Sequence, residues 1–264
     1  MVNTLIKIIK YQIHDIIRSK WILIYTIFFF AVSYSIFSFS DNFTKIVISL
    51  LNVTLLFIPL VSIIFGTIYL YNNKEYIVFM LSQPIKRETL YLGLYFGMAA
   101  PLILSFLFGA GIPFLIFVNK FTIDNPILFL LIASGILQTL IFSSLAFYIT
   151  TLNENKLLGL GVSIFFWLFF TAIYDGIILL LLNNFQDYPL EQISLALTFL
   201  NPIDLARVLL ILKLDISALM GYTGAVFQKF FSNSFGIFIS LIAMTLWFLI
   251  PLIAGLKKFI KKDF

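Results

Sequence analysis

The sequence has 264 residues, of which 61% are hydrophobic and only 11% are charged. A soluble domain carries about 25% charged residues, because charges cover its water-facing surface. Seventeen basic and twelve acidic side chains are too few to keep a 30.3 kDa chain in water, and the mean hydropathy is +1.07. The composition therefore excludes a soluble globular protein and predicts a chain embedded in a lipid bilayer.

Six stretches contain no side chain that is charged at neutral pH, and each can hold one membrane-spanning helix of about 20 apolar residues. Helices are favoured over a β-barrel because the runs are apolar on every face, whereas barrel strands alternate in polarity. The predicted fold class is all-α, a polytopic membrane protein with six transmembrane helices in a single domain of residues 1–264. The charge-free stretches are residues 21–40, 46–73, 89–119, 125–153, 157–174 and 230–256.

The distribution of basic residues predicts the orientation, because cytoplasmic segments of membrane proteins are enriched in Lys and Arg. With both termini in the cytoplasm, twelve of the 17 basic residues lie inside and five outside. We therefore expect a multi-pass protein of the bacterial inner membrane with both termini in the cytoplasm. The first span is longer than the apolar core of a cleavable signal peptide, so we expect it to remain in the mature protein.

Several kinds of chemistry are excluded by residues that the chain lacks. It has no Cys and a single His, which leaves no disulfide, no thiolate metal site and no ordinary zinc site. No Gly-x-x-x-x-Gly-Lys-Ser/Thr phosphate loop, no paired catalytic carboxylates and no Ser–His–Asp set occur. The five Met residues are scattered singly, whereas Cu(I) prefers clustered soft ligands. We expect no catalytic residue, no metal ligand and no cofactor on this chain.

Residues 1–20 predict an amphipathic helix that lies in the membrane interface. An isoleucine stripe at helical spacing forms one face, and basic side chains occupy the rest. The stripe consists of Ile6, Ile9, Ile13 and Ile16, and the other positions carry Lys7, Lys10, His14 and Arg18. The helix is expected to anchor the chain, with contact to a nucleotide-binding subunit as an added role, and His14 is expected to face solvent or lipid headgroups.

The connection at residues 72–91 is predicted to form two helices with a break between them. A short helix is expected from Glu75 to Leu81, and Pro84 biases the residue before it away from helical geometry. Lys86 and Arg87 follow the break at once. A charged turn between two anchored helices can act as a lever, because a push on the turn rotates the helices on both sides.

This connection resembles the signature E…LL-S-x-P-I-x-R…L-x-K of ABC-2 type permeases. The resemblance rests on Glu75, the run Leu-Ser-Gln-Pro-Ile-Lys-Arg at 81–87, and Leu92-Gly93. Lys86 stands where many members have Ser, and Leu94 where many have Lys. The resemblance implies a six-span subunit, not itself an enzyme, that forms a homodimer and works with separate subunits that bind and hydrolyse ATP. It also implies that the residues docking on the ATPase are Glu75, Ser82, Gln83, Pro84, Ile85, Lys86 and Arg87.

The 47 residues from 183 to 229 form a long outer segment between the fifth and sixth spans. Asn201-Pro202 is typical of a helix start, and Asp204 adds favourable negative charge in the first turn. Residues 215–227 are a second helix-like stretch, interrupted by Gly221 and Gly224. We expect an ordered, helical periplasmic segment rather than a simple connector.

The outer runs 201–207 and 214–224 resemble the permeases of NosDFY systems, which support assembly of the copper centre of nitrous oxide reductase. The resemblance implies a NosF-like ATP-binding subunit and a NosD-like periplasmic protein as partners. It also implies that contacts to the periplasmic protein, or an outer gate, involve Asn201, Pro202, Asp204, Arg207, Asp215 and Tyr222. Ordinary re-entrant helices that cap the outer mouth are the alternative interpretation.

Asp175 is the only acidic residue in a predicted span, which makes it a candidate polar site within the membrane. At a rise of 1.5 Å per residue it lies about 27 Å along a helix that starts at Leu157. We therefore expect Asp175 near the outer surface, where its side chain reaches water. Gly93 and Gly97 are spaced to allow close approach of another helix.

The sequence as a whole favours a permease subunit of an ABC transporter. It would couple ATP hydrolysis in a partner to transport, or to conformational work on a periplasmic protein in copper-centre maturation. Two alternatives remain, a general ABC-2 exporter of a lipid, glycan or drug, and a membrane scaffold or channel that works without ATP.

Overall fold

The computed structural model describes residues 2–117, 125–184, 191–213 and 234–262, and these ranges contain helices and no strand. The described helices include six that are long and apolar enough to cross a membrane, as predicted. They are α2 (Lys20–Phe39), α3 (Phe43–Asn72), α5 (Arg87–Phe117), α6 (Asn125–Leu152), a composite fifth span that starts with α7 (Lys156–Leu168), and α12 (Ser234–Lys261). The shorter helices are α1 (Val2–Ile17), α4 (Lys74–Leu81), α8 (Tyr174–Asn184), α9 (Glu191–Phe199) and α10 (Pro202–Lys213). The chain is an all-α, multi-pass membrane protein.

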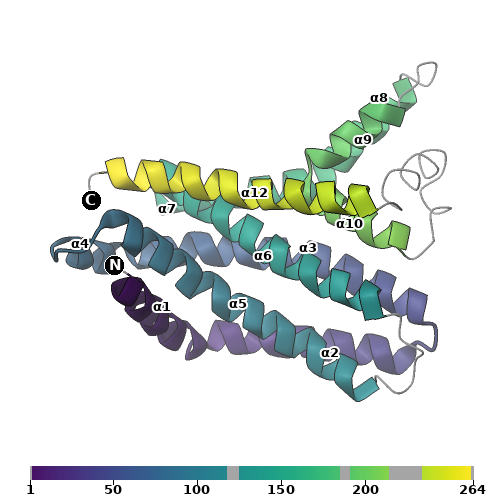
Figure 1. Cartoon of the computed structure of the whole chain (residues 1–264), viewed down its shortest axis with the longest axis horizontal. Helices are drawn as coiled ribbons and strands as arrows, with labels where there is room; N and C mark the ends of the chain where they lie inside the picture. Colours follow the sequence, from purple (N-terminus) through teal and green to yellow (C-terminus); the bar gives the residue numbers. More distant parts are fainter. Residues whose placement is uncertain (1, 118–124, 185–190, 214–233, 263–264) are drawn as a thin grey trace.

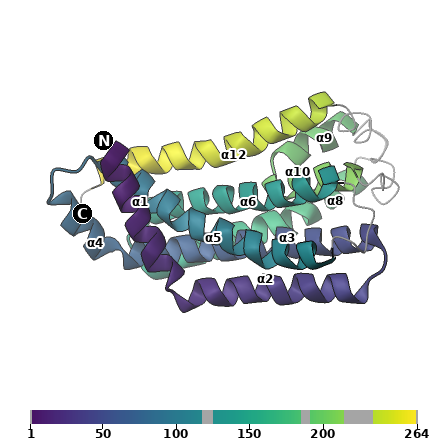
Figure 2. The same ribbon diagram turned by 60° about the horizontal axis from the view of Figure 1, so that its bottom comes forward.

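The spans form an elongated bundle with both chain termini at one end, together with α4 (Figures 1 and 2). We call this the terminal end and the opposite one the far end. Helix α3 packs on α6, α6 on α12, and α2 on α5. At the far end, α8 and α9 lean away from the bundle, and α10 returns beside α12 (Figure 1).

Small residues let α3 and α6 pack closely in the centre of the bundle. A Cβ atom at Gly66 would lie 2.8 Å from the Cβ of Ala146, so only glycine fits there. Ser62, Ser143 and their neighbours are buried on the same faces. Such small residues are typical of membrane helix interfaces, because helix association in lipid depends on close packing.

Helix α1 crosses α5 at the two glycines that were expected to allow close approach. A Cβ atom at Gly93 or Gly97 would lie 2.6 Å from side-chain atoms of Ile8 or Gln12, respectively. Gln12 is 1% exposed, and its Oε1 accepts a hydrogen bond of 2.6 Å from the hydroxyl of Tyr69 in α3. The predicted helix is confirmed, and these contacts hold it against the bundle.

The predicted isoleucine stripe of α1 is only partly correct. Ile16 is buried, but Ile6 is 53% exposed, and the face that packs on α5 carries Ile8 and Gln12 instead. The two glycines and the Tyr69 hydroxyl decide which face of α1 is buried, and these partners lie 57 or more residues away in sequence. The four basic side chains of the helix are exposed, as predicted.

The fifth span extends beyond the charge-free stretch 157–174. After α7 it passes through one π-helical segment, Phe169–Ile173, and continues as α8, so that the apolar helix extends to Leu181. The prediction that Asp175 belongs to a span and that the outer segment follows from about residue 183 agrees with this helix. Asp175 lies within this helix and not at its outer end, because the apolar residues 177–181 continue it beyond the carboxylate.

Candidate functional site

Two polar regions lie at opposite ends of the bundle, and the connection between α3 and α5 forms the first. Helix α4 extends from Lys74 to Leu81, close to the predicted bounds, and the break at Ser82 separates it from α5. The hydroxyl of Ser82 donates to the carbonyl of Phe79 at 2.7 Å, and the amide of Ile85 donates to the carbonyl of Gln83 at 2.6 Å. These local bonds stabilise a tight turn at the terminal end of the molecule.

Most of the residues that were predicted to dock on an ATPase are exposed on this turn. The exposed ones are Glu75, Ser82, Gln83, Pro84 and Lys86, whereas Ile85 and Arg87 are partly buried. Ile77 is buried and attaches α4 to the rest of the chain. Five of the seven predicted residues are therefore exposed in α4 and the turn that follows it.

Arg87 differs from these residues, because its guanidinium is bonded to its own chain. Its Nη1 donates to the carbonyl of Ile260 at 2.8 Å and to that of Lys262 at 2.6 Å. Both carbonyls lie at the C-terminus of α12, where a cation compensates the unpaired carbonyl groups and the helix dipole. Arg87 thus ties the start of α5 to the end of α12.

Lys262 extends this attachment to α6. Its Nζ donates to the carbonyl of Thr151 at 3.3 Å. Partial burial lowers the pKa of this ammonium, and the nearby carboxylate of Glu154 opposes that shift. Helices α5, α6 and α12 are therefore joined by polar contacts at the terminal end.

The sequence analysis missed two exposed apolar residues of α4. Val78 and Phe79 lie beside the polar turn and are 45% and 59% exposed. Tyr11 of α1 stacks on Tyr76 of α4 with ring centroids 5.9 Å apart, so α1 adjoins the same region. We define the terminal-end surface as Tyr11, Glu75, Val78, Phe79, Ser82, Gln83, Pro84 and Lys86. Apolar side chains rimmed by polar ones are typical of a protein–protein contact, and the apolar run Ile77–Met80 was the sequence signal for it.

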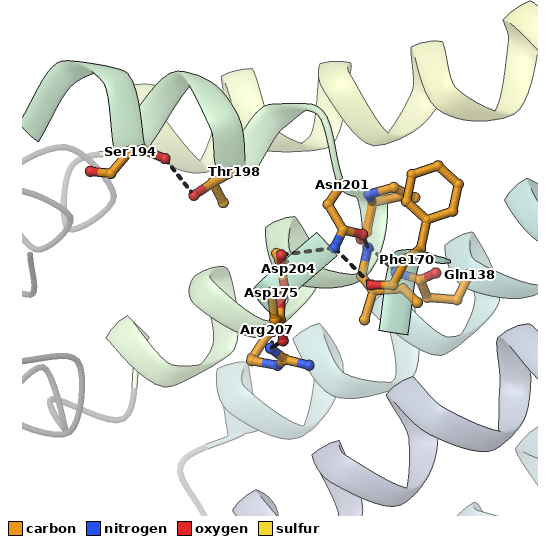
Figure 3. A network of polar contacts seen from close by, with 10 residues as sticks. Gln138, Phe170, Asp175, Ser194, Thr198, Asn201, Asp204 and Arg207 are labelled. Atoms are coloured by element: carbon orange, nitrogen blue, oxygen red, sulfur yellow. Dashed lines mark hydrogen bonds and ion pairs between the residues drawn. The ribbon is translucent and has the colours of Figure 1, made fainter. Parts of the chain in front are cut away.

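The second polar region lies at the far end and joins α8 to α10 (Figure 3). We call Asp175, Asn201, Asp204 and Arg207 the far-end cluster. The Nη1 of Arg207 donates to Asp175 at 2.9 Å and to Asp204 at 3.0 Å. Asp175 and Arg207 are partly exposed, whereas Asp204 is 7% exposed. One guanidinium therefore compensates two carboxylates that come from different helices.

Asn201 lies at the centre of this cluster and is fully buried. Its Oδ1 accepts from the amide of Ile203 at 3.0 Å, which is the usual N-cap contact of a helix start. Its Nδ2 donates to Asp204 at 2.7 Å and to the carbonyl of Phe170 at 2.8 Å. Phe170 lies in the π-helical segment, where the wider turn changes the backbone hydrogen bonds. Asn201 thus connects the start of α10 to the irregular part of the fifth span.

Two further side chains attach α9 and α10 to the bundle. The Nε2 of Gln138 in α6 donates to the carbonyl of Pro202 at 2.6 Å. The indole of Trp247 in α12 donates to the carbonyl of Phe199 at 3.0 Å. The sequence analysis missed both, although Gln138 is an amide within a membrane span; in the structure it is completely buried.

The carboxyl group of Asp204 has a pKa well above its ordinary value. Burial raises its pKa to about 7, the charge of Asp175 acts in the same direction, and the charge of Arg207 opposes the shift. Desolvation disfavours the ionised form of a buried carboxyl group, which accounts for the direction. The protonation of the far-end cluster therefore changes near neutral pH.

The structure unites residues that the sequence analysis had treated separately. Asn201, Asp204 and Arg207 were predicted as one outer group and Asp175 as an isolated site, yet all four form one hydrogen-bonded cluster. Pro202 begins α10, as predicted. Asp215 and Tyr222 lie outside the described residues.

Comparison with known proteins identifies the class of this molecule. The ABC-2 family transporter proteins match the chain over residues 6–264, so the chain belongs to this family and is a transporter permease subunit. Among individual proteins, it is similar to the probable ABC transporter permease protein NosY of Pseudomonas aeruginosa. The two are 24% identical over 230 residues, which cover 81% of this chain and 84% of the relative.

Proposed function

We propose that this permease subunit couples ATP hydrolysis in a partner to conformational change at the far end of the bundle. The terminal end lies in the cytoplasm, where a NosF-like ATP-binding subunit docks on the terminal-end surface. Two copies of the chain and two ATPases form the working unit. The excess of basic residues on the terminal side supports this orientation.

The observation that carries the proposal is the hydrogen bonding of Arg87. Because its guanidinium bonds the last carbonyls of α12, a force on the α4–α5 turn acts on α12 as well as on α5. Helix α12 spans the bundle and bonds the end of α9 through Trp247. Movement imposed by an ATPase at one end would therefore reach α9 and α10 at the other.

The finer part of the proposal concerns the partner at the far end. There the chain would act on a NosD-like periplasmic protein during maturation of the copper centre of nitrous oxide reductase. The run 201–207 and the similarity to NosY support this assignment. A partner would respond to α9 and α10, whose position depends on the far-end cluster.

Co-purification with the NosF-like ATPase tests the docking proposal. Lys86→Glu and Phe79→Glu place negative charge on the terminal-end surface, and we expect each to reduce the amount of bound ATPase at least about tenfold, a loss of about 1.4 kcal/mol. Both side chains are exposed, so the fold should not suffer. Arg87 is unsuitable for this test, because its substitution would also remove the contacts to α12.

Lys45→Glu is the matched control, since Lys45 is an exposed lysine at the far-end start of α3. It should leave ATPase binding unchanged. Normal ATPase binding by both terminal-end variants would contradict the proposal. If the ATPase binds but nitrous oxide reductase matures without this chain, only the finer assignment fails, and a general exporter becomes the better description.

A further inference from the structure

A groove between α2 and α3 is not used by the proposed coupling. It consists of two adjoining cavities with volumes of about 590 Å³ and 330 Å³ that share Trp21, Leu60, Val61 and Phe65. The groove exists because α2 packs mainly on α5 and α3 mainly on α6, which leaves space between the two neighbouring helices. The polar residues that line one part of it come from the junction of α1 with α2 and from the end of α3, and Figure 2 shows these segments at the terminal end; we call this part the opening.

The groove changes from polar to apolar along its length. Asp15, Ser19, Asn72 and Asn73 line the opening, and the deeper walls are apolar down to Phe57. From residue 72 to residue 57 a helix rises about 22 Å, which exceeds the roughly 15 Å of hydrocarbon in one leaflet. An occupant with one polar end and a long apolar chain matches this shape.

One acidic residue lines the opening, and two basic residues adjoin residues that line it. The Asp15 carboxylate is exposed and lines it. Lys20 is exposed and lies between two lining residues in sequence, and the Nζ of Lys156 donates to the lining Asn72 at 2.9 Å. Trp21 is also exposed and lines the groove next to Ser19. Tryptophan is enriched at the level of the lipid headgroups in membrane proteins. A headgroup that carries both a phosphate and an amine would find partners for each.

The hydroxyl of Tyr25 provides an independent indication of a polar ligand atom. Tyr25 lines the deeper cavity, and its buried hydroxyl has no hydrogen-bond partner among the described residues. A buried hydroxyl without a partner is costly, so such groups usually bind something. Tyr25 lies one helical turn, or about 6 Å, below Trp21. A lipid ester carbonyl, which lies just below the headgroup, would accept its proton.

We propose that this groove binds one molecule of phosphatidylethanolamine. The phosphate lies near Lys20 and Lys156, the amine contacts Asp15, an ester carbonyl accepts a hydrogen bond from Tyr25, and an acyl chain fills the space between α2 and α3. This is a bound structural lipid and not a transported substrate. The site does not depend on the ATPase or on the periplasmic partner.

Native mass spectrometry of the purified full-length chain tests this proposal. Delipidated protein is mixed with phosphatidylethanolamine or with phosphatidylglycerol, and we expect one tightly retained phosphatidylethanolamine and at least about fivefold weaker retention of phosphatidylglycerol, about 1 kcal/mol. Tyr25→Phe should reduce retention severalfold, Ile64→Trp should abolish it by filling the groove, and Asp15→Asn should remove the preference for the amine.

Two controls separate lipid binding from damage to the fold. Tyr91→Phe removes another buried hydroxyl without a partner, and Leu104→Trp adds the same bulk on an exposed face of α5; neither residue lines the groove. Both should retain lipid like the wild type, and all variants should keep the thermal unfolding profile of the apo chain.

Three outcomes would overturn the proposal. Lipid retained equally by the wild type, Tyr25→Phe and Ile64→Trp would show that it binds elsewhere. Equal retention of the two lipids would contradict the contact between Asp15 and the lipid amine. An Ile64→Cys variant that forms disulfide-linked dimers in the membrane would show that a second copy, and not a lipid, covers the groove. ATPase binding is not measured in this experiment, so its result is independent of the proposed coupling.

Discussion

Arg207 illustrates how one side chain can determine the position of a whole segment. Its guanidinium lies between Asp175 of the fifth span and Asp204 of α10, at 2.9 Å and 3.0 Å. Removing it would leave two carboxylates close together in a site of low polarity, where unpaired charge is costly. Close to it, the Nδ2 of Asn201 donates a hydrogen bond to the carbonyl of Phe170 in the π-helical segment. These polar contacts add to an apolar one, because Ile203, Leu205, Ala206, Val208 and Leu210 of α10 are buried in the hydrophobic core.

The raised pKa of Asp204 predicts that this attachment weakens as the pH rises. The folded pKa of about 7 is above the ordinary value of 3.8, so the folded state binds more protons than the unfolded state between these values. The contribution of this group to the stability of the folded state is fully present below about pH 4 and is lost as the pH rises through about 7. Asp175, Arg207 and Tyr174 are the other titratable groups that act on this carboxyl group or adjoin it.

Hydrogen exchange in α10 measures this effect when the wild type is compared with Asp204→Asn at each pH, because intrinsic exchange rates then cancel. At pH 5 we expect equal protection of residues 202–213. At pH 8 the wild type should exchange severalfold faster than the variant, since only the wild type carries a buried negative charge there. A ratio that stays constant from pH 5 to pH 8 would contradict the raised pKa.

At the scale of elements, α1 is positioned by the shape of α5 rather than by its own hydrophobic pattern. Gly93 and Gly97 provide a concave surface, and the amphipathic helix turns until Ile8 and Gln12 enter it. Gln12 then reaches the Tyr69 hydroxyl of α3. The N-terminal helix is thereby connected to both helices that flank the α4 turn.

Gly97→Leu is predicted to detach α1, because the new Cβ atom alone would lie 2.6 Å from Gln12. Overpacking of this kind costs about 1–3 kcal/mol. Gly111→Leu on the same helix is the control, since its Cβ atom would meet nothing within 4 Å. Hydrogen exchange should become faster in residues 2–17 of the first variant alone. Unchanged protection of α1 would show that other contacts hold the helix.

At the scale of the whole molecule, the bundle separates two polar regions that differ in exposure. The terminal-end surface is exposed and mixes apolar and polar groups, whereas the far-end cluster is largely buried and links helices. The spans between them carry few charges, so the basic residues outside them determine the orientation in the membrane.

The proposed orientation can be measured directly because the chain contains no Cys. Lys86→Cys and Lys45→Cys each introduce one exposed thiol, the first at the terminal end and the second at the far end. In intact spheroplasts an impermeant maleimide should label only the second, and permeabilisation should add labelling of the first. The reverse pattern would invert the proposed topology.

The sequence by itself determined the features that depend on local composition. Six spans follow from apolar runs, the break before α5 from Pro84, and the start of α10 from Asn201-Pro202. Each depends on residues within one helical length, because bilayer thickness and proline geometry act locally. The exposed position of most of the predicted docking residues also followed from this short-range pattern.

Only the tertiary structure decided which polar groups meet. Arg87 bonds carbonyls 173 and 175 residues further along, and Arg207 reaches a carboxylate 32 residues before it. No periodicity encodes such distances, so Arg87 was interpreted as an exposed contact and Asp175 as an isolated site. The buried face of α1 depended on neighbouring helices in the same way. The apolar pattern of the sequence determines which segments lie in the membrane. The packing of the helices determines which partner each polar group meets.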